Sequence, residues 1–302
     1  RSRYAIFPAA SSPCIQRGGS EPVIRSLRNI WRLLRVARIL ARHDALFPLE
    51  ELDIAPGVAA LARMLAGPPK APENGKEAAG RPEGRKGQRL ARALNEAGPS
   101  FIKLGQALAT RSDLLGEELA ADLSDLQDRL PPFPTSEARA IIEREFGEPL
   151  ENLFSRFDDA PVAAASIAQV HFAITPEGQE VAVKILRPGI EEAFKRELDL
   201  MRWVAGLLET TRPELRRLKP LQCVDTLSET VELEMDLRFE AAAAAEIGDN
   251  FEGDDDFRVP EVDWGRTGRR VLTTARLSGI PLDERDAIIE AGHDPVAVLE
   301  KA

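Results

Sequence analysis

The sequence predicts an α+β protein in which helices come first and a small antiparallel sheet follows. Apolar residues recur at steps of three or four from about residue 24 to residue 147, which is typical of helices. The pattern then changes to alternation on both sides of the turn sequence TPEG at 175–178, and strand-like residues return at 270–277. We therefore expect helices over 20–150 and the sheet between about 155 and 277.

The first predicted helix, over 24–42, carries a stripe of arginines. They follow each other at steps of three or four, which places them on one side of a helix: Arg25, Arg28, Arg32, Arg35, Arg38 and Arg42. Residues 1–68 hold ten arginines and five acidic residues, whereas the rest of the chain has a net charge of −15. The helix either lies on an anionic membrane surface, where each arginine contributes about 1 kcal/mol, or packs against the chain with its arginines in water.

A linker and a helical block come next. Residues 67–88 combine proline, glycine and charge with almost no bulky apolar side chain, which predicts a flexible linker. A helix is expected over 89–111, with a break at 98–100 where Gly-Pro-Ser starts a second helix. Two further helices are predicted, one over 114–130 that ends at paired prolines and one over 135–146 that ends at a glycine.

The hairpin places a lysine on a half-buried strand. Residues 169–174 and 180–186 alternate on either side of the turn, and Lys184 projects from the face opposite Val183. A lysine at the end of the strand VAVK, with an acidic helix later in the chain, is typical of a group that contacts nucleotide phosphates. On its own, a VAVK sequence more often belongs to an edge strand whose lysine lies at the surface.

An acidic segment supplies candidate partners for this lysine. A helix predicted over 223–247 carries Glu234, Asp236 and Glu240. Asp236 and Glu240 are four residues apart and share a face, whereas Glu234 is rotated away from both. Either Glu240 or Glu234 is the carboxylate that orients Lys184.

The stretch before the hairpin has alanines where a phosphate loop usually has glycines. It reads PVAAAS at 161–166 and contains Ala163, Ala164, Ala165 and Ser166. Backbone N–H groups of such a loop can still face phosphate, although each Cβ restricts positive φ and close approach. On composition alone, the segment is a packing turn of small residues.

Six segments occur in a fixed order that no generic motif explains. They are FIKLGQ (101–106), LQDRLPP (126–132), PVAAASIAQVH (161–171), VAVKILRPG (181–189), ELEMDLRFEAA (232–242) and VLTTARLSGIPL (271–282). Together they resemble the UbiB family of atypical, protein-kinase-like proteins associated with ubiquinone biosynthesis. The first resembles the family's KxGQ signature, the third its alanine-rich loop and the fifth its acidic ExD helix. The similarity runs from about residue 20 to the end of the chain.

The resemblance implies a protein-kinase-like N-lobe that follows a helical KxGQ extension, with the C-lobe largely absent. It implies that Ala163 to Ser166 cover the phosphates of ATP and that Lys184, paired with Glu240, contacts them. It also implies that the extension folds over the place where ordinary kinases bind a protein substrate, and that five residues face this cleft: Lys103, Gly105, Gln106, Glu234 and Asp236. Such a cleft favours a small or lipid-linked substrate, or ATP hydrolysis itself.

The sequence departs from the family pattern in two places. The segment that crosses between lobes has Ala275-Arg276 where the family usually has a glutamate and an aromatic residue, which affects the adenine side of the site. The residues after Lys184 contain neither a His-x-Asp catalytic loop nor an Asp-Phe-Gly motif. We therefore expect the Mg²⁺ ligands and the catalytic aspartates to lie after Ala302, and the chain as given to be inactive.

These observations predict an atypical kinase or ATPase that supports ubiquinone biosynthesis, with ATP and Mg²⁺ as cofactors. The alternative is a non-catalytic pseudokinase that organises the biosynthetic enzymes at the membrane. Expected partners are an anionic membrane surface, contacted through 24–42, lipid-like quinone precursors and other enzymes of the pathway. Nucleic acid is not an expected partner, because the chain after residue 68 has a net charge of −15 and repels phosphate. We expect the protein at the cytoplasmic face of the bacterial inner membrane, or at the corresponding organellar membrane.

We expect five regions along the chain. They are a basic helical region (1–66), a flexible linker (67–88), the helical KxGQ extension (89–150), the kinase-like N-lobe (151–277) and the start of a truncated C-lobe (278–302). The two cysteines have no partner close in sequence, which fits a reducing compartment.

Overall fold

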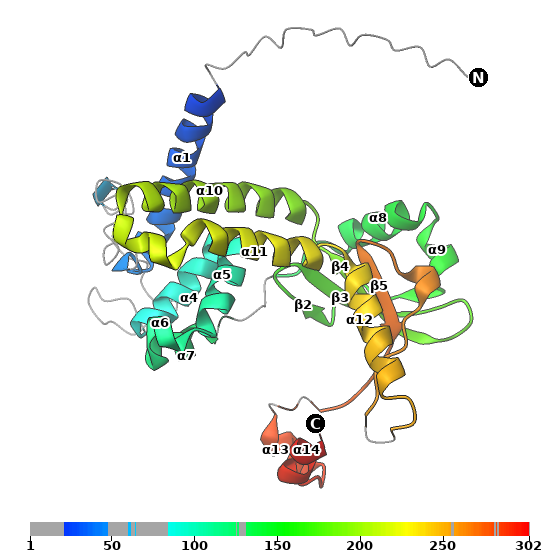
Figure 1. The fold of residues 1–302 in the computed structure, drawn as a ribbon. Helices are drawn as coiled ribbons and strands as arrows, with labels where there is room; N and C mark the ends of the chain where they lie inside the picture. The colour runs from blue at the N-terminus through cyan, green and yellow to red at the C-terminus, as the bar shows by residue number, and fades with distance from the viewer. Residues whose placement is uncertain are drawn as a thin grey trace, which may run out of the picture.

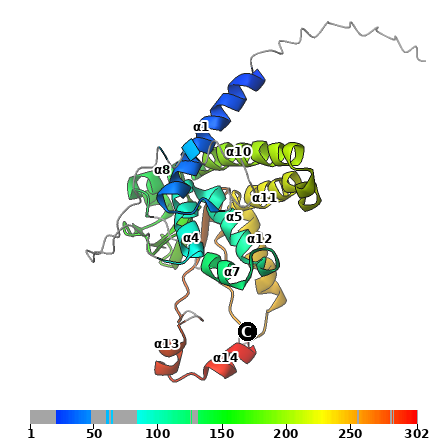
Figure 2. The same ribbon diagram turned by 90° about the vertical axis from the view of Figure 1, so that its left-hand side faces the viewer.

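A computed structural model describes residues 21–47, 60, 61, 64, 84–124, 126, 131–254, 257–280, 282 and 284–301. Residues 67–83 of the predicted linker lie outside these residues, whereas its last three residues, 86–88, belong to the helix Lys86–Ala97. Within them, a body of helices stands beside a small twisted sheet, as Figures 1 and 2 show. The described part of the chain contains no helix that is long and apolar enough to cross a membrane.

In the described part of the chain, four strands follow one another in a single block, and a fifth strand comes later, after a further group of helices. The helices are α1 (Glu21–Arg42), α4 (Lys86–Ala97), α5 (Pro99–Ala109), α6 (Ser112–Leu115), α7 (Glu117–Ser124), α8 (Thr135–Phe146), α9 (Leu150–Leu153), α10 (Ile190–Thr211), α11 (Pro220–Glu234), α12 (Leu237–Asn250), α13 (Arg285–Glu290) and α14 (Pro295–Lys301), with the 3-10 turns η1 (Pro213–Leu218) and η2 (Trp264–Arg266). The strands are β1 (Arg156–Phe157), β2 (Ala163–Ala164), β3 (Ala168–Ile174), β4 (Glu180–Leu186) and β5 (Val271–Ala275).

The basic helix α1 is only half docked. Its C-terminal half buries Leu33, Ala37 and Leu40 in the core of the helical body. Its N-terminal half projects from that body (Figures 1 and 2), and Trp31 there is 74% exposed. Docking against the chain, one of the two alternatives for this helix, therefore holds for its C-terminal half.

Two of the helix predictions need correction. The segment 114–130 is not one helix, because Gly116 adopts a left-handed φ of 80° that separates α6 from α7, and α7 ends at Ser124. The acidic helix expected over 223–247 is also two helices, since α11 ends at Glu234 and α12 begins at Leu237. Other boundaries agree, including the break at 98–100 and the helix over 135–146.

The sheet is antiparallel and follows the order β1-β3-β4-β5, with β2 also paired to β3. The predicted hairpin of β3 and β4 is confirmed, and the strand at 270–277 is β5. One face of the sheet contributes Val183, Ile185 and Val271 to a core with α8 and α9. The other face contributes Leu186 and Leu272 to the core of the helical body. The sheet therefore joins the two cores.

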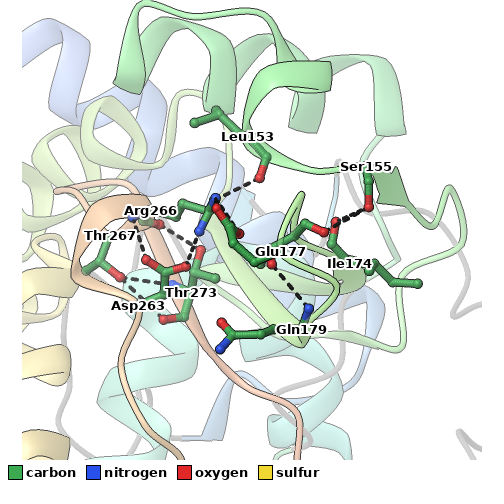
Figure 3. Close-up of polar contacts among 10 residues, drawn as sticks. Leu153, Ser155, Ile174, Glu177, Gln179, Asp263, Arg266, Thr267 and Thr273 are labelled. Carbon is green, nitrogen blue, oxygen red and sulfur yellow. Dashed lines mark hydrogen bonds and ion pairs between the residues drawn. The ribbon is translucent and has the colours of Figure 1, made fainter.

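Arg266 closes the end of the hairpin, as Figure 3 shows. Its Nε donates to the Leu153 carbonyl at 2.8 Å, and its terminal nitrogens contact the carboxylates of Asp263 at 2.7 Å and Glu177 at 3.0 Å. Its own carbonyl accepts a bond from the Thr273 hydroxyl at 2.7 Å. The hairpin turn, α9 and η2 are thus held by one guanidinium, which is a structural role.

Candidate functional site

Lys184 lies on the sheet face that turns toward α12. Its Nζ is 2.8 Å from both carboxylate oxygens of Glu240, the residue one turn into that helix. The lysine side chain is 28% exposed and the glutamate 49%, so water reaches the pair. A two-oxygen contact fixes the ammonium and still leaves it accessible to a further anion.

The alanine-rich segment shares this face. Ala163 pairs with Val170, Val170 pairs with Lys184, and Lys184 pairs with Leu272, so these four residues form one row across four strands. Residues in register across a sheet project to the same side. The backbone of Ala163 therefore stands two strands, about 10 Å, from that of Lys184.

Burial differs along the alanine-rich segment. Ala163 is exposed, Ala164 and Ala165 are half-buried, and Ser166 is fully buried. A tight turn follows, because the Ala165 N–H donates to the Ala168 carbonyl at 2.8 Å. The side of the loop toward solvent is thus lined by the alanines.

The opposite end of the same face is covered by Arg276. Phe172 lies two residues from Val170 on β3, and the Arg276 guanidinium stands 3.9 Å from the centre of its ring. The same side chain is 3.6 Å from the Glu180 carboxylate, and the Arg276 N–H donates to the Glu180 carbonyl at 3.0 Å. The Ala275 N–H donates to the carbonyl of Glu261 at 2.8 Å. Both backbone donors of the pair 275–276 are therefore already engaged.

A second lysine–glutamate pair lies in the helical body. Lys103 of α5 contacts Glu234, the last residue of α11, at 2.8 Å, and the two side chains are 18% and 30% exposed. Gln106, three residues along α5, is half-buried. Gly105 is buried, and a Cβ on it would stand 2.4 Å from a methyl carbon of Leu126. The glycine thus allows α5 to pack closely.

Asp236 has a different environment from Glu234. It caps α12, accepting a bond from the Arg238 N–H at 3.2 Å, and its carboxylate contacts the Arg238 guanidinium at 2.6 Å. The hydrogen bond from Arg238 lowers the pKa of Asp236. Asp236 also borders a groove of about 760 Å³ between α10, α11 and α12. The structure thus assigns the two acidic residues different partners, with Lys103 against Glu234 and Arg238 against Asp236.

Sequence reasoning missed a buried polar network on the other face of β3. The Gln169 side chain accepts from the Phe133 N–H at 3.0 Å and donates to the Phe133 carbonyl at 3.3 Å. Its amide also contacts Nε2 of His171 at 2.8 Å, while Nδ1 of that ring contacts the Asp158 carbonyl at 2.8 Å. A carbonyl only accepts and the Gln169 amide nitrogen only donates, so Nδ1 carries the proton, Nε2 accepts and the imidazole is neutral. Burial lowers the pKa of His171, which supports this state. The local sequence does not signal the network, because Phe133 lies 36 residues from Gln169 and Asp158 lies 13 residues from His171.

A lysine strand paired with a helix carboxylate beside a small antiparallel sheet is typical of protein-kinase-like folds. In agreement, residues 125–302 match the ABC1 atypical kinase-like domain. The mixture of helices with this sheet fits a kinase-like fold.

Proteins of similar sequence indicate one family among the kinase-like proteins. The "Probable protein kinase UbiB" of Marinobacter nauticus is 41% identical over 277 residues, which are 91% of this chain and 49% of the relative. The protein of the same name from Xylella fastidiosa is 37% identical over 276 residues, with coverage of 91% and 48%. The chain belongs to the UbiB family, and it spans about half the length of these relatives.

A solved structure is also similar, the complex of Rv3197 with erythromycin from Mycobacterium tuberculosis. It is 33% identical, with a TM-score of 0.46, and the alignment covers 65% of this chain and 48% of that chain.

Proposed function

We propose that this protein is an ATP-binding, UbiB-type atypical kinase or ATPase that supports ubiquinone biosynthesis. The observation that carries the proposal is the Lys184–Glu240 pair, in register with the alanine-rich loop. An ammonium held by a helix carboxylate near a loop of small residues is the arrangement that kinase-like proteins use for nucleotide phosphates.

The residues around Lys184 fit a nucleotide triphosphate. The ammonium is held in place yet partly exposed, and the exposed Ala163 adds no bulky side chain beside it. Ala182 lies on the same face and is half-buried, which suits the flat apolar surface of a base, while the ring of its cross-strand neighbour Phe172 is covered by Arg276. In this arrangement Lys184 is the phosphate contact, Glu240 orients it, and Ala163 to Ser166 cover the phosphates mainly through their backbone.

The proposal extends to the organisation of the chain. Residues 89–150 form the KxGQ extension, 151–277 the kinase-like N-lobe and 278–302 the start of the C-lobe, after the basic region 1–66 and the linker 67–88. The family cleft is lined by Lys103, Gln106, Glu234 and Asp236, and Gly105 allows α5 to pack closely beside it. The Mg²⁺ ligands and catalytic aspartates belong to the part of the relatives' length that this chain does not span. The acceptor is a small or lipid-linked quinone precursor, or water.

The test is nucleotide-dependent thermal stabilisation of the full-length protein. Mg-ATP should raise the melting temperature of the wild type, and Lys184→Ala should abolish the rise. The exposed Arg217→Ala on η1 is the matched control, because it removes one positive charge outside the sheet and outside the groove that Asp236 borders. Equal stabilisation of wild type and Lys184→Ala by Mg-ATP would contradict the phosphate contact.

A second candidate is a pseudokinase scaffold that organises ubiquinone-biosynthesis enzymes. It is favoured by the Ala275-Arg276 segment, because both of its N–H groups are already hydrogen-bonded and Arg276 covers Phe172. ATP hydrolysis by the full-length protein, measured with lipid and a quinone-precursor analogue, separates the two candidates. Nucleotide binding without turnover, together with pathway enzymes that co-purify, would favour the scaffold.

We also propose that α1 attaches the protein to an anionic membrane surface, at the cytoplasmic face of the inner membrane or its organellar counterpart. Leu27, Ile30 and Trp31 are 55%, 39% and 74% exposed, and Arg28 and Arg35 are exposed on the same projecting helix. Apolar side chains beside arginines suit an interface with anionic headgroups.

Liposome flotation tests the attachment. Replacing Leu27, Ile30 and Trp31 together by serine removes apolar surface that the core does not use, so folding should be preserved. We expect the variant to lose flotation with anionic vesicles, whereas exposed Leu207→Ser on α10 keeps it. If the triple variant, or a chain lacking 24–42, floated as the wild type does, α1 would not be the segment that binds the membrane.

A further inference from the structure

Arg187, directly after the lysine strand, contacts the alanine-rich loop. Its Nε donates to the Ala165 carbonyl at 2.8 Å, and its backbone N–H donates to the Ile167 carbonyl at 2.8 Å. The loop is thus bonded twice to a single residue, once through the side chain and once through the backbone. The side-chain bond is charge-assisted and half-buried, so it is stronger than a neutral bond in water.

The same guanidinium reaches a second segment. Its Nη1 donates to the Pro131 carbonyl at 3.0 Å, and the group stands 5.6 Å from the centre of the Phe133 ring. Residues 131–133 lead directly into α8. Phe133 is itself held on both backbone groups by the Gln169 side chain of β3. The position of this segment is therefore set from the sheet.

We infer that Arg187 is a positioning residue that latches the alanine-rich loop to the segment 131–133. The loop then lies where β3, α8 and the segment before α8 together place it, and it does not move as a free hairpin tip. Any shift of residues 131–133 is transmitted to the Ala165 carbonyl through one rigid group. The latch is a property of the fold, while its effect on nucleotide rests on the proposed function.

The latch requires the shape of arginine. The planar guanidinium holds Nε and Nη1 in a fixed fork, so one side chain reaches the carbonyls of Ala165 and Pro131 while its central carbon stands 5.6 Å from the centre of the Phe133 ring. A lysine has one nitrogen on a flexible stem and lacks this fork. Glutamine retains some of the length and polarity of arginine, but it has no charge and cannot bond to the Ala165 and Pro131 carbonyls at the same time.

Hydrogen exchange of the nucleotide-free protein tests the latch directly. In Arg187→Gln, amide exchange in peptides covering 160–168 should rise about tenfold, whereas exchange at the hairpin turn 175–179 should stay unchanged. Arg187→Lys should give an intermediate rate. The control is Arg202→Gln on α10, which removes an arginine whose partner is Asp225 and which is far in sequence from the loop. Equal exchange over 160–168 in wild type and Arg187→Gln would overturn the latch, as would a uniform rise over the whole protein.

Nucleotide affinity tests whether the latch affects nucleotide binding. We expect Arg187→Gln to weaken Mg-ATP binding by the full-length protein about fivefold to tenfold, with a smaller effect on adenosine, because the loop faces the phosphates. Equal weakening of both ligands would mean a merely structural role. If wild-type protein binds no nucleotide, the proposed function fails, and the exchange result still decides whether the latch exists.

Discussion

The ammonium of Lys103 lies 2.8 Å from the carboxylate of Glu234, a residue 131 positions later in the chain. This pair joins α5 to the end of α11. Two residues further on, Asp236 caps α12, the helix that presents Glu240 to Lys184. The two lysine–glutamate pairs are therefore linked through one short helix junction, and the position of α5 bears on the carboxylate that orients Lys184.

Breaking the first pair should destabilise the protein. We expect a double-mutant cycle with Lys103→Ala and Glu234→Ala to give a coupling free energy of about 1–2 kcal/mol in urea unfolding, because both side chains are largely shielded from water. The exposed pair of Arg202 and Asp225 supplies the matched cycle, with a coupling below about 0.5 kcal/mol. Indistinguishable couplings in the two cycles would show that the burial of the Lys103 pair adds nothing.

Two glycines on helices should respond to alanine in opposite directions. In Gly105→Ala the new methyl group meets carbons of Leu126 at 2.4 Å and Leu94 at 2.8 Å, so we expect a loss of about 1–3 kcal/mol. In Gly206→Ala on α10 the nearest heavy atom is 4.0 Å away, so the higher helix propensity of alanine should add about 0.5–1 kcal/mol. Urea unfolding measures both changes. A neutral Gly105→Ala would mean that α5 has room to move.

The stability of the protein should fall on mild acidification because of His171. Burial lowers the pKa of His171 in the folded protein, while the unfolded chain titrates near its ordinary value of about 6.5. Between these two values the unfolded state binds more protons, so stability present above about pH 6.5 is lost as the pH falls. Protonation would also place an N–H at Nε2 against the donating amide of Gln169.

Urea unfolding at pH 5.5 and 7.5 measures this contribution. We expect His171→Gln to be less stable than wild type at pH 7.5, since it loses the ring stacked 4.8 Å from Phe157, but to show a smaller drop between the two pH values. His293→Gln, at an exposed histidine, should keep the full wild-type drop. If His171→Gln retained it as well, the acid sensitivity would arise elsewhere.

Arg276 should influence which base the site accepts. Its guanidinium covers Phe172 on the Lys184 side of the sheet, and Arg276→Ala would uncover that ring. If ATP binds as proposed, this variant should change the ratio of ATP to GTP affinity several-fold while the ratio of ATP to ADP affinity stays constant, because the phosphates lie at the other end of the same sheet face. Isothermal titration of the full-length protein with the three nucleotides provides both ratios. A change confined to the ATP to ADP ratio would place Arg276 near the phosphates instead.

The local pattern of the chain determined much of the architecture. Alternation around the turn at 175–178 predicted the hairpin and the side of the strand on which Lys184 lies, because a strand has a strict period of two. Helix signals predicted α8 from Thr135 to Phe146 and the break before Pro99, since capping and proline effects act within a few residues. The ordered motifs indicated the UbiB family, which the similar proteins confirm.

The position at which a helix is interrupted was harder to predict from the sequence. The segment ELEMDLRFEAA has good helix formers throughout, so its sequence predicted one helix with Asp236 and Glu240 on one face. In the structure the Asp236 side chain caps a new helix, and the Leu237 N–H donates to the carbonyl of Arg269, a residue from beyond the helix. Asp236 is a local N-cap signal for this break, but the Arg269 carbonyl that accepts from Leu237 is a distant partner that the local sequence does not show.

The sequence by itself determined which side chains were available, namely two lysines, two glutamates and a loop of small residues in a family order. Only the tertiary structure decided that Lys184 meets Glu240 while Lys103 meets Glu234, that Arg187 reaches both Ala165 and Pro131, and that a buried glutamine holds Phe133. Each of these contacts joins residues at least 22 positions apart. Such pairs form only after the helices and the sheet have packed, because burial of apolar faces sets the distances and side-chain chemistry then selects among the groups brought within reach.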